Sequence, residues 1–322
     1  MAFRFDPAER IRDEVPRCAR EQLDEAVRQL SEGVKSDPAK AVHEARKAVK
    51  KNRALLRFAR GAVPREQRRS ENAALRGAAR GLSGVRDAEV MVGTIDRLSD
   101  TFAGQVPERT FSAVRKKLDE ARQAHRAAAV DTALHSDAVE DLGAALLRVE
   151  EWRLERGGWR ALKPGLTETY RRGRKAFRRA QDEPTLRNLH EWRKQVKDLW
   201  YELRLLQPVC GPVVQGQAKE AGELSDLLGD DHDLGVLSQT VAEMSDELAL
   251  DTEALEALIE HRRGELQLEA MFAGGRLYAE RRKAFVRRIH SYWRAGRARA
   301  RAERRGRPAQ LATATRKPHA LA

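Results

Sequence analysis

The sequence predicts an all-α protein built from a helical-bundle module that occurs twice. Ala, Leu, Arg and Glu dominate the 322 residues and favour helix, whereas the strand-favouring residues Val, Ile, Thr and Tyr are sparse. Two short motifs also recur in the same order and at nearly the same separation, which indicates an internal duplication. The expected architecture is a pair of related bundles with pseudo-twofold symmetry and a basic concave surface.

The first half contains clear signals for helix ends. Asp37 is an expected N-cap, and Pro38 follows it at the first helical position, where proline is well tolerated. Ser83-Gly84 is expected to break the chain before Asp87 caps another helix. The predicted helices of this half cover residues 7–33, 38–61, 64–82, 87–99, 107–133 and 137–152.

The second half is expected to follow a joint made by Gly157-Gly158 and by residues 163–165, which read Lys-Pro-Gly. Gly229 is expected to break the chain, and Asp233 to cap the next helix. The predicted helices of this half cover residues 166–180, 184–206, 212–228 and 233–248, a segment opening at 251–252, and a segment that follows 274–275 and ends at 293.

These elements predict one domain over residues 1–293, made of two repeats at about 5–155 and 163–293. A chain of this length can bury a substantial hydrophobic core. Residues 294–322 are rich in arginine and carry no hydrophobic periodicity, so a disordered basic tail is expected there.

The most informative motif, H-E-x-R-K-x-V-K, begins at His43 and again at His190. At about 100° per residue, offsets 0, +3, +4, +7 and +14 from the histidine lie within a sector about 100° wide. Each motif therefore places a basic stripe on one helix face, opposite apolar side chains such as Val49 and Val196. The stripes consist of His43, Arg46, Lys47, Lys50 and Arg57 in the first copy, and of His190, Arg193, Lys194, Lys197 and Arg204 in the second.

A second motif follows each stripe, as Leu-Ser-Gly-Val-Arg-Asp over residues 82–87 and as Leu-Gly-Asp-Asp-His-Asp over residues 228–233. With both motifs duplicated, residues 5–293 resemble the CHAD (conserved histidine α-helical domain) family. Its pattern is a helix of type H-x-x-R-K-x-x-K followed by an L-G-x-x-R/H-D turn. Ser83, in place of glycine, and the acidic pair Asp230-Asp231 depart from that pattern.

The resemblance implies a compact helical bundle with internal pseudo-symmetry, whose basic surface binds inorganic polyphosphate, in several members on polyphosphate granules. The side chains of the two stripes suit this ligand, because Arg offers a bidentate fork to phosphate oxygens and Lys offers a mobile point charge. Additional and less specific candidates for the binding surface are Arg76, Arg80, Arg171, Arg172, Arg174, Lys175, Arg178 and Arg288, with Arg179, Arg281, Arg282, Lys283 and Arg287 in the same basic clusters.

The net charge of +13 also points to an acidic partner, such as nucleic acid, an anionic membrane or polyphosphate. Cys18 and Cys210 are far apart and lack the paired spacing of a metal site, which indicates reduced thiols. No apolar run approaches the ~20 residues that span a bilayer, and the start of the chain has no signal-like apolar segment. A cytoplasmic protein with no membrane partner is therefore expected.

Other interpretations stay open at the level of the sequence. A basic helix face is often only solvated surface, and a histidine in a bundle often bonds to a neighbouring carbonyl or carboxylate. A nucleic-acid-binding protein would use the same charge without sequence preference, although an aromatic content of 5% is low for base stacking. A scaffold that binds an acidic protein is a third hypothesis, and the oligomeric state is not predicted.

An enzyme or metal site would draw on His190, Asp230, Asp231, His232 and Asp233, which form an acidic cluster with histidines. The first half has no counterpart of this cluster. The sequence also contains no Walker A loop, no nucleophile elbow and no H-E-x-x-H motif. We therefore expect a non-enzymatic protein with no cofactor and no metal.

Overall fold

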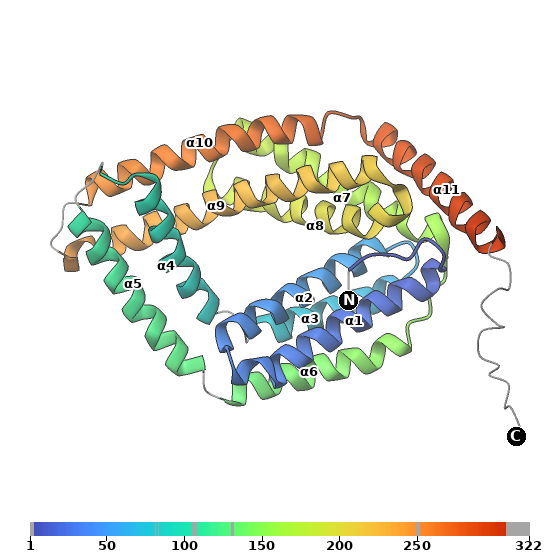
Figure 1. The fold of residues 1–322 in the computed structure, drawn as a ribbon, viewed down its shortest axis with the longest axis horizontal. Helices are drawn as coiled ribbons and strands as arrows, with labels where there is room; N and C mark the ends of the chain where they lie inside the picture. The colour runs from blue at the N-terminus through green and yellow to red at the C-terminus, as the bar shows by residue number, and fades with distance from the viewer. Residues whose placement is uncertain are drawn as a thin grey trace, which may run out of the picture.

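The computed structural model describes residues 3–80, 82, 84–104, 108–129, 132–248 and 252–306. These residues form α-helices and one short 3₁₀ helix, with no strand in any of the described ranges (Figure 1). The all-α prediction is confirmed. The helices are α1 (Ile11–Ser31), α2 (Pro38–Phe58), α3 (Arg65–Arg80), α4 (Gly84–Thr101), α5 (Glu108–Ala129), α6 (Thr132–Glu150), α7 (Gly158–Asp182), α8 (Leu186–Cys210), α9 (Pro212–Leu248), α10 (Glu253–Leu277) and α11 (Arg282–Gly306).

The start of α2 follows the predicted capping signal. The Asp37 side chain accepts a hydrogen bond from the backbone N–H of Lys40 at 3.0 Å, and Pro38 occupies the first helical position. The preceding helix α1 begins at Ile11, four residues later than predicted, because the chain before it is used for packing. Phe5 is buried there, and its backbone N–H donates to the carbonyl oxygen of Leu205 in α8 at 3.1 Å.

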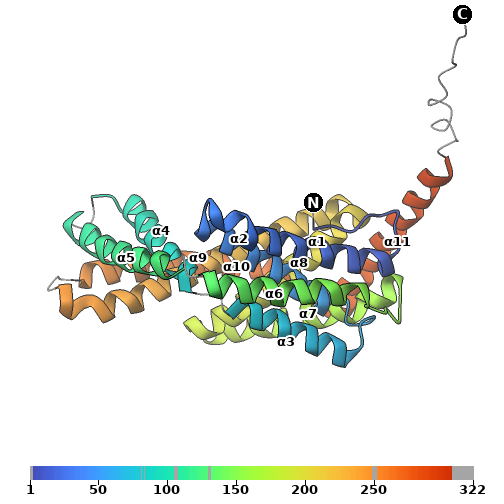
Figure 2. The same ribbon diagram turned by 90° about the horizontal axis from the view of Figure 1, so that it is seen from below.

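The buried apolar side chains form two clusters. The larger core joins α1, α2, α3, α6, α7 and α8 with parts of α9, α10 and α11. The smaller core joins α4 and α5 with the second half of α9 and the first half of α10, and it forms one end of the elongated molecule (Figures 1 and 2). Since α4 and α5 belong to the first sequence repeat and α9 and α10 to the second, the smaller core forms between the repeats.

Two predicted N-caps are wrong. The 37-residue helix α9 continues through Gly229, so Asp233 lies inside a helix and is not its N-cap. The helix continues because buried positions recur at helical spacing on both sides of the glycine, as at Leu224, Leu228 and Leu234. Asp87 is likewise not an N-cap, because α4 already begins at Gly84. The predicted break at residue 83 and the side chain of residue 87 lie outside the described residues.

The joint between the halves is partly as predicted. The glycine pair does mark the boundary, since α7 begins at Gly158, whose φ is +57°. Pro164 and Gly165, however, lie within α7, because Gly165 serves close packing and not chain reversal. A Cβ atom added at Gly165 would lie 2.1 Å from the carbonyl oxygen of Phe58 in α2. The backbones of α7 and α2 therefore touch at this point.

The prediction of a disordered tail from residue 294 is wrong for residues 294–306, which continue α11. Ala and Arg favour helix there, and polar contacts hold the segment to the start of the chain. Arg297 donates hydrogen bonds to the backbone carbonyl oxygens of Pro7 and Glu9, and Arg304 forms an ion pair with Glu9 at 2.9 Å. Residues 307–322 lie outside the described residues. In the described ranges, no helix combines the length and apolar character needed to cross a membrane.

The contact at Gly165 gives a direct test of the packing. Gly165→Ala should lower the free energy of unfolding by about 1–3 kcal/mol, because a methyl group there meets backbone that cannot move aside. The matched control is Gly264→Ala in α10, where an added Cβ meets nothing within 4 Å. This control should raise the free energy of unfolding by about 0.5–1 kcal/mol through helix propensity. Urea denaturation measures the free energy of unfolding of both variants, and equal effects would contradict the close contact between α7 and α2.

Candidate polyanion-binding surface

The predicted stripe on α2 is partly occupied by contacts within the protein. Lys47 forms an ion pair with Glu44 at 3.0 Å, and the Nε2 atom of His43 lies 3.8 Å from the same carboxylate. Arg46 donates a hydrogen bond to the carbonyl oxygen of Leu82 at 2.6 Å, which ties α2 to the segment before α4. The histidine and the two basic residues therefore face neighbours in the fold as well as solvent.

The predicted stripe on α8 is engaged in a similar way. Lys194 forms an ion pair with Glu191 at 2.6 Å. Lys197 and Arg204 both lie over the ring of Trp200, at 4.3 and 4.9 Å from its centroid, where the cations are stabilised by the π system. Arg193 lies against Gly229 of α9, and a Cβ atom added at that glycine would be 3.1 Å from its guanidinium. Gly229 thus makes room for an arginine of the stripe.

Helices α2 and α8 approach one another at corresponding positions of the two repeats. Corresponding positions are 147 residues apart, as for His43 and His190. Arg57 forms an ion pair with Asp198 at 2.5 Å. The counterpart of Asp198 in α2 is Lys51, so the position that faces Arg204 holds a cation in place of a carboxylate. Burial lowers the pKa of Lys51, and the positive charges of Lys47 and Arg204 lower it further. The two stripes therefore approach one another where α2 and α8 pack.

The two histidines of α8 and α9 lie side by side. The rings of His190 and His232 have centroids 4.3 Å apart. Burial lowers the pKa of His190 to about 4, and the neighbouring His232, Lys194 and Arg193 contribute in the same direction. Burial also lowers the pKa of His232. Both rings are therefore neutral at pH 7, and His190 acts there as a polar group of the helix pair rather than as a cation.

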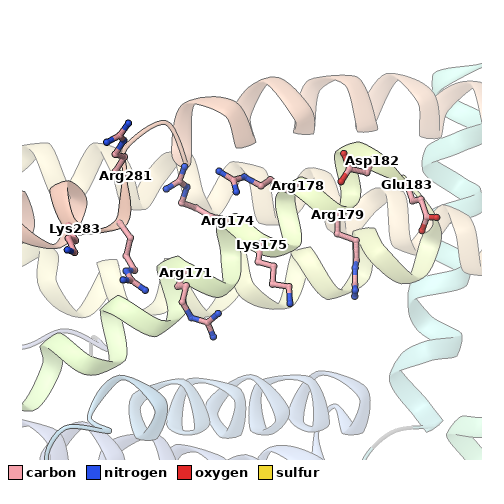
Figure 3. Close-up of a pocket in the computed structure, with 10 residues that line it drawn as sticks. Arg171, Arg174, Lys175, Arg178, Arg179, Asp182, Glu183, Arg281 and Lys283 are labelled. Atoms are coloured by element: carbon pink, nitrogen blue, oxygen red, sulfur yellow. The ribbon is translucent and has the colours of Figure 1, made fainter.

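A groove between α7 and the start of α11 gathers more positive charge than either stripe. It has a volume of about 800 Å³. Figure 3 shows cationic side chains along α7, with Arg281 and Lys283 on the neighbouring ribbon and Asp182 and Glu183 at the end of α7. We call it the basic groove. Its lining residues are Arg171, Arg174, Lys175, Arg178, Arg179, Asp182, Glu183, Arg281, Arg282 and Lys283.

The cations of the basic groove differ from those of the stripes in having few partners. Arg171 forms an ion pair with Glu168 at 2.7 Å. In the ranges that the structure describes, the other seven cations of the groove have neither an ion pair nor a side-chain hydrogen bond. The helix positions them because α7 buries the opposite face, including Leu166, Tyr170 and Phe177, in the larger core.

The remaining candidates lie in different surroundings. Arg172 forms an ion pair with Glu168 at 2.7 Å, and Arg288 forms one with Glu280 at 2.8 Å. Arg76 is exposed on α3, close enough to Arg53 of α2 to help lower its pKa, after burial and Arg57. Arg80 is exposed at the end of the same helix. These residues add positive charge near α2 and α7 but do not line the basic groove.

The acidic cluster after Leu228 is structural. Asp231 is 1% exposed and accepts hydrogen bonds from Gln267 at 2.8 Å and from Arg263 at 3.2 Å, both in α10. Asp230 lies 3.8 Å from Arg97 of α4. Among the described residues, no group of three or more His, Cys, Asp or Glu side chains is arranged to hold a metal ion. The carboxylates instead fasten α9 to its neighbours.

Sequence patterns found the parts of the basic groove but not the groove itself. The run from Arg171 to Arg179 and the run from Arg281 to Lys283 are both visible as basic clusters. They are about a hundred residues apart in the chain, and no motif connects them. Only the packing of α7 beside α11 brings them to one surface.

These features define a basic, all-helical protein with two related H-E-x-R-K-x-V-K helices. The CHAD domain family model matches residues 17–242, and the chain belongs to this family. Its fold is similar to that of PptA from Streptomyces chartreusis, with a TM-score of 0.60 at 14% identity over 84% of this chain and 100% of that one. It is also similar to the CHAD domain from the plant Ricinus communis, with a TM-score of 0.55 at 18% identity over 90% and 95%. No functionally curated protein matches the chain.

The lowered pKa of His190 predicts how stability depends on pH. Unfolding restores the ordinary pKa near 6.5, so the unfolded chain binds more protons between pH 6.5 and about 4. The contribution of the neutral ring to stability is complete above pH 6.5 and is lost as the pH falls. His190→Gln should therefore flatten the decrease in free energy of unfolding between pH 7 and 5, as measured by urea denaturation. An unchanged pH dependence would show that the ring is not held neutral by its surroundings.

Proposed function

We propose that this protein binds inorganic polyphosphate without catalytic turnover, and that the basic groove is its principal binding site. The observation that carries the proposal is the set of seven groove cations that have no partner within the described residues. Like charges held together on one surface repel one another, and a bound anion relieves this repulsion. Membership of the CHAD family supports the choice of ligand, because resemblance to that family implies polyphosphate.

A phosphate chain suits the chemistry of the groove. The chain carries roughly one negative charge per unit and presents no base edges, so its receptor needs many cations along a rigid surface. Arginines such as Arg174 and Arg178 offer bidentate hydrogen bonds to phosphate oxygens, and Lys175 and Lys283 add charges on flexible stems. Binding should weaken steeply as salt rises, by analogy with the counterion release that accompanies protein binding to DNA.

The stripes of α2 and α8 form a second contact surface in this proposal. Among the described residues, Lys47 and Lys194 form ion pairs only with glutamates one helical turn away, and exposed pairs of this kind contribute about 0–1 kcal/mol. A phosphate group can therefore replace the glutamate at little cost. Arg57 lies beside Asp198 of α8, and Arg204 lies near Lys51 of α2, and these corresponding positions support a pseudo-twofold arrangement of the stripes. We also propose a cytoplasmic location for the protein, on polyphosphate granules when polyphosphate accumulates in them.

Charge reversal in the groove tests the proposal. Arg174→Glu combined with Arg178→Glu should weaken polyphosphate binding at least tenfold at about 0.15 M salt, because each charge-assisted contact contributes about 1.5–3 kcal/mol. Arg46→Glu with Lys50→Glu should weaken binding by less. Calorimetric titration of the purified full chain with polyphosphate measures the dissociation constants.

The matched control is Arg109→Glu with Lys116→Glu, because both side chains are exposed on α5 and the net charge changes by the same amount. This control should weaken binding by less than about threefold through long-range charge alone. If the control is as damaging as the groove variant, affinity follows total charge and the basic groove is not a site.

A further inference from the structure

Two more hollows continue the surface of the basic groove toward the start of α7. The first has a volume of about 480 Å³ and is lined by Trp159, Lys163, Thr167, Arg282, Lys283, Val286, Arg287 and His290. It shares Arg282 and Lys283 with the basic groove. Its four cations face no carboxylate within the hollow, so it too attracts anions.

The second hollow, of about 950 Å³, lies between the start of α7 and the later turns of α11. Among the described residues, its lining includes five arginines and no carboxylate, and it shares Trp159 and His290 with the first hollow. The arginines are Arg10, Arg12, Arg294, Arg297 and Arg301. In the described part of the chain, Arg10, Arg294 and Arg301 have no ion pair and no side-chain hydrogen bond. The two hollows therefore meet at a shared aromatic pair, Trp159 and His290.

The aromatic pair is flat and ordered by packing. The rings of Trp159 and His290 are stacked, with centroids 4.9 Å apart and an interplanar angle of 12°. Trp293 supports Trp159 from a centroid distance of 6.0 Å. Burial lowers the pKa of His290, and the charges of Arg294 and Lys163 lower it further, so the imidazole is neutral near pH 7. Both rings of the pair are half-buried, which leaves part of their surface open to the hollows.

This combination differs from the basic groove, which has no aromatic lining residue. A phosphate chain gains nothing from a flat ring, whereas a nucleobase stacks on one. The described surface around these hollows offers a single stacked pair rather than a row of rings, which fits one base better than a strand of successive bases. Cations on both sides of the pair suit the phosphates attached to that base.

We propose that the Trp159–His290 pair is the base-binding part of a nucleotide site. The base of a nucleoside 5′-triphosphate stacks on the pair, and its phosphates contact Arg282, Lys283 and Arg287. The site goes beyond the proposed polyphosphate function and shares only Arg282 and Lys283 with the basic groove.

The test compares ATP with inorganic triphosphate, which carries at least as much charge but has no base. Calorimetric titration of the full chain, at fixed salt and without divalent cations, should give a dissociation constant for ATP about 5- to 100-fold lower than that for triphosphate. Trp159→Ala should bring the ATP value to within about threefold of the triphosphate value and leave triphosphate binding unchanged. Trp159→Phe should restore most of the preference, since it keeps a flat ring.

Two results would overturn the proposal. They are equal affinities of the wild-type chain for ATP and triphosphate, and an equal loss of both in Trp159→Ala. If Trp159→Ala does not fold, His290→Ala removes the partner ring and should lower the preference for ATP in the same way. Polyphosphate titration of the same samples separates the two proposals, because Trp159→Ala should leave long-chain binding in the basic groove unchanged.

Discussion

The close packing of α7 against the larger core is the interaction on which the basic groove depends. Gly165 brings the backbone of α7 against Phe58, while Tyr170 stacks on Phe285 of α11 at a centroid distance of 3.9 Å. With that face buried, the arginines and lysines of α7 have only the outer surface left. The same contacts set α11 beside α7, so that Arg281–Lys283 complete the groove. A change that separates the helices would therefore disperse the charges.

The stripes and the basic groove differ in how far neighbouring groups offset their positive charge. On α2 and α8, glutamates, the carbonyl oxygen of Leu82 and the Trp200 ring already offset much of the charge, so these stripes also stabilise the fold. On α7, the cations stand at the surface without such partners in the described ranges. Surface charges that are uncompensated weaken the folded state slightly, and they remain available to a ligand. The basic groove is therefore suited to binding a ligand, whereas the stripes serve both binding and packing.

Local rules in the sequence predicted the parts of the fold that depend on nearby residues. Asp37-Pro38 specifies the start of α2 through capping alone, and the motif period assigns the exposed faces of α2 and α8. Gly165 and Gly229 misled the prediction, because glycine marks close contact with Phe58 and Arg193 and not a break. The helical segment after Trp293 was missed because its contacts, to Pro7 and Glu9, come from the other end of the chain. Which cations lack partners is likewise decided by tertiary packing.

Lysine footprinting with and without bound polyphosphate tests the central claim most directly. An amine-reactive reagent followed by mass spectrometry reports the accessibility of each lysine in the full chain. Polyphosphate in the basic groove should protect Lys175 and Lys283 strongly and leave Lys116 and Lys219, which are exposed on α5 and α9, as reactive as before. Unchanged reactivity of Lys175 and Lys283 at saturating polyphosphate would contradict the account.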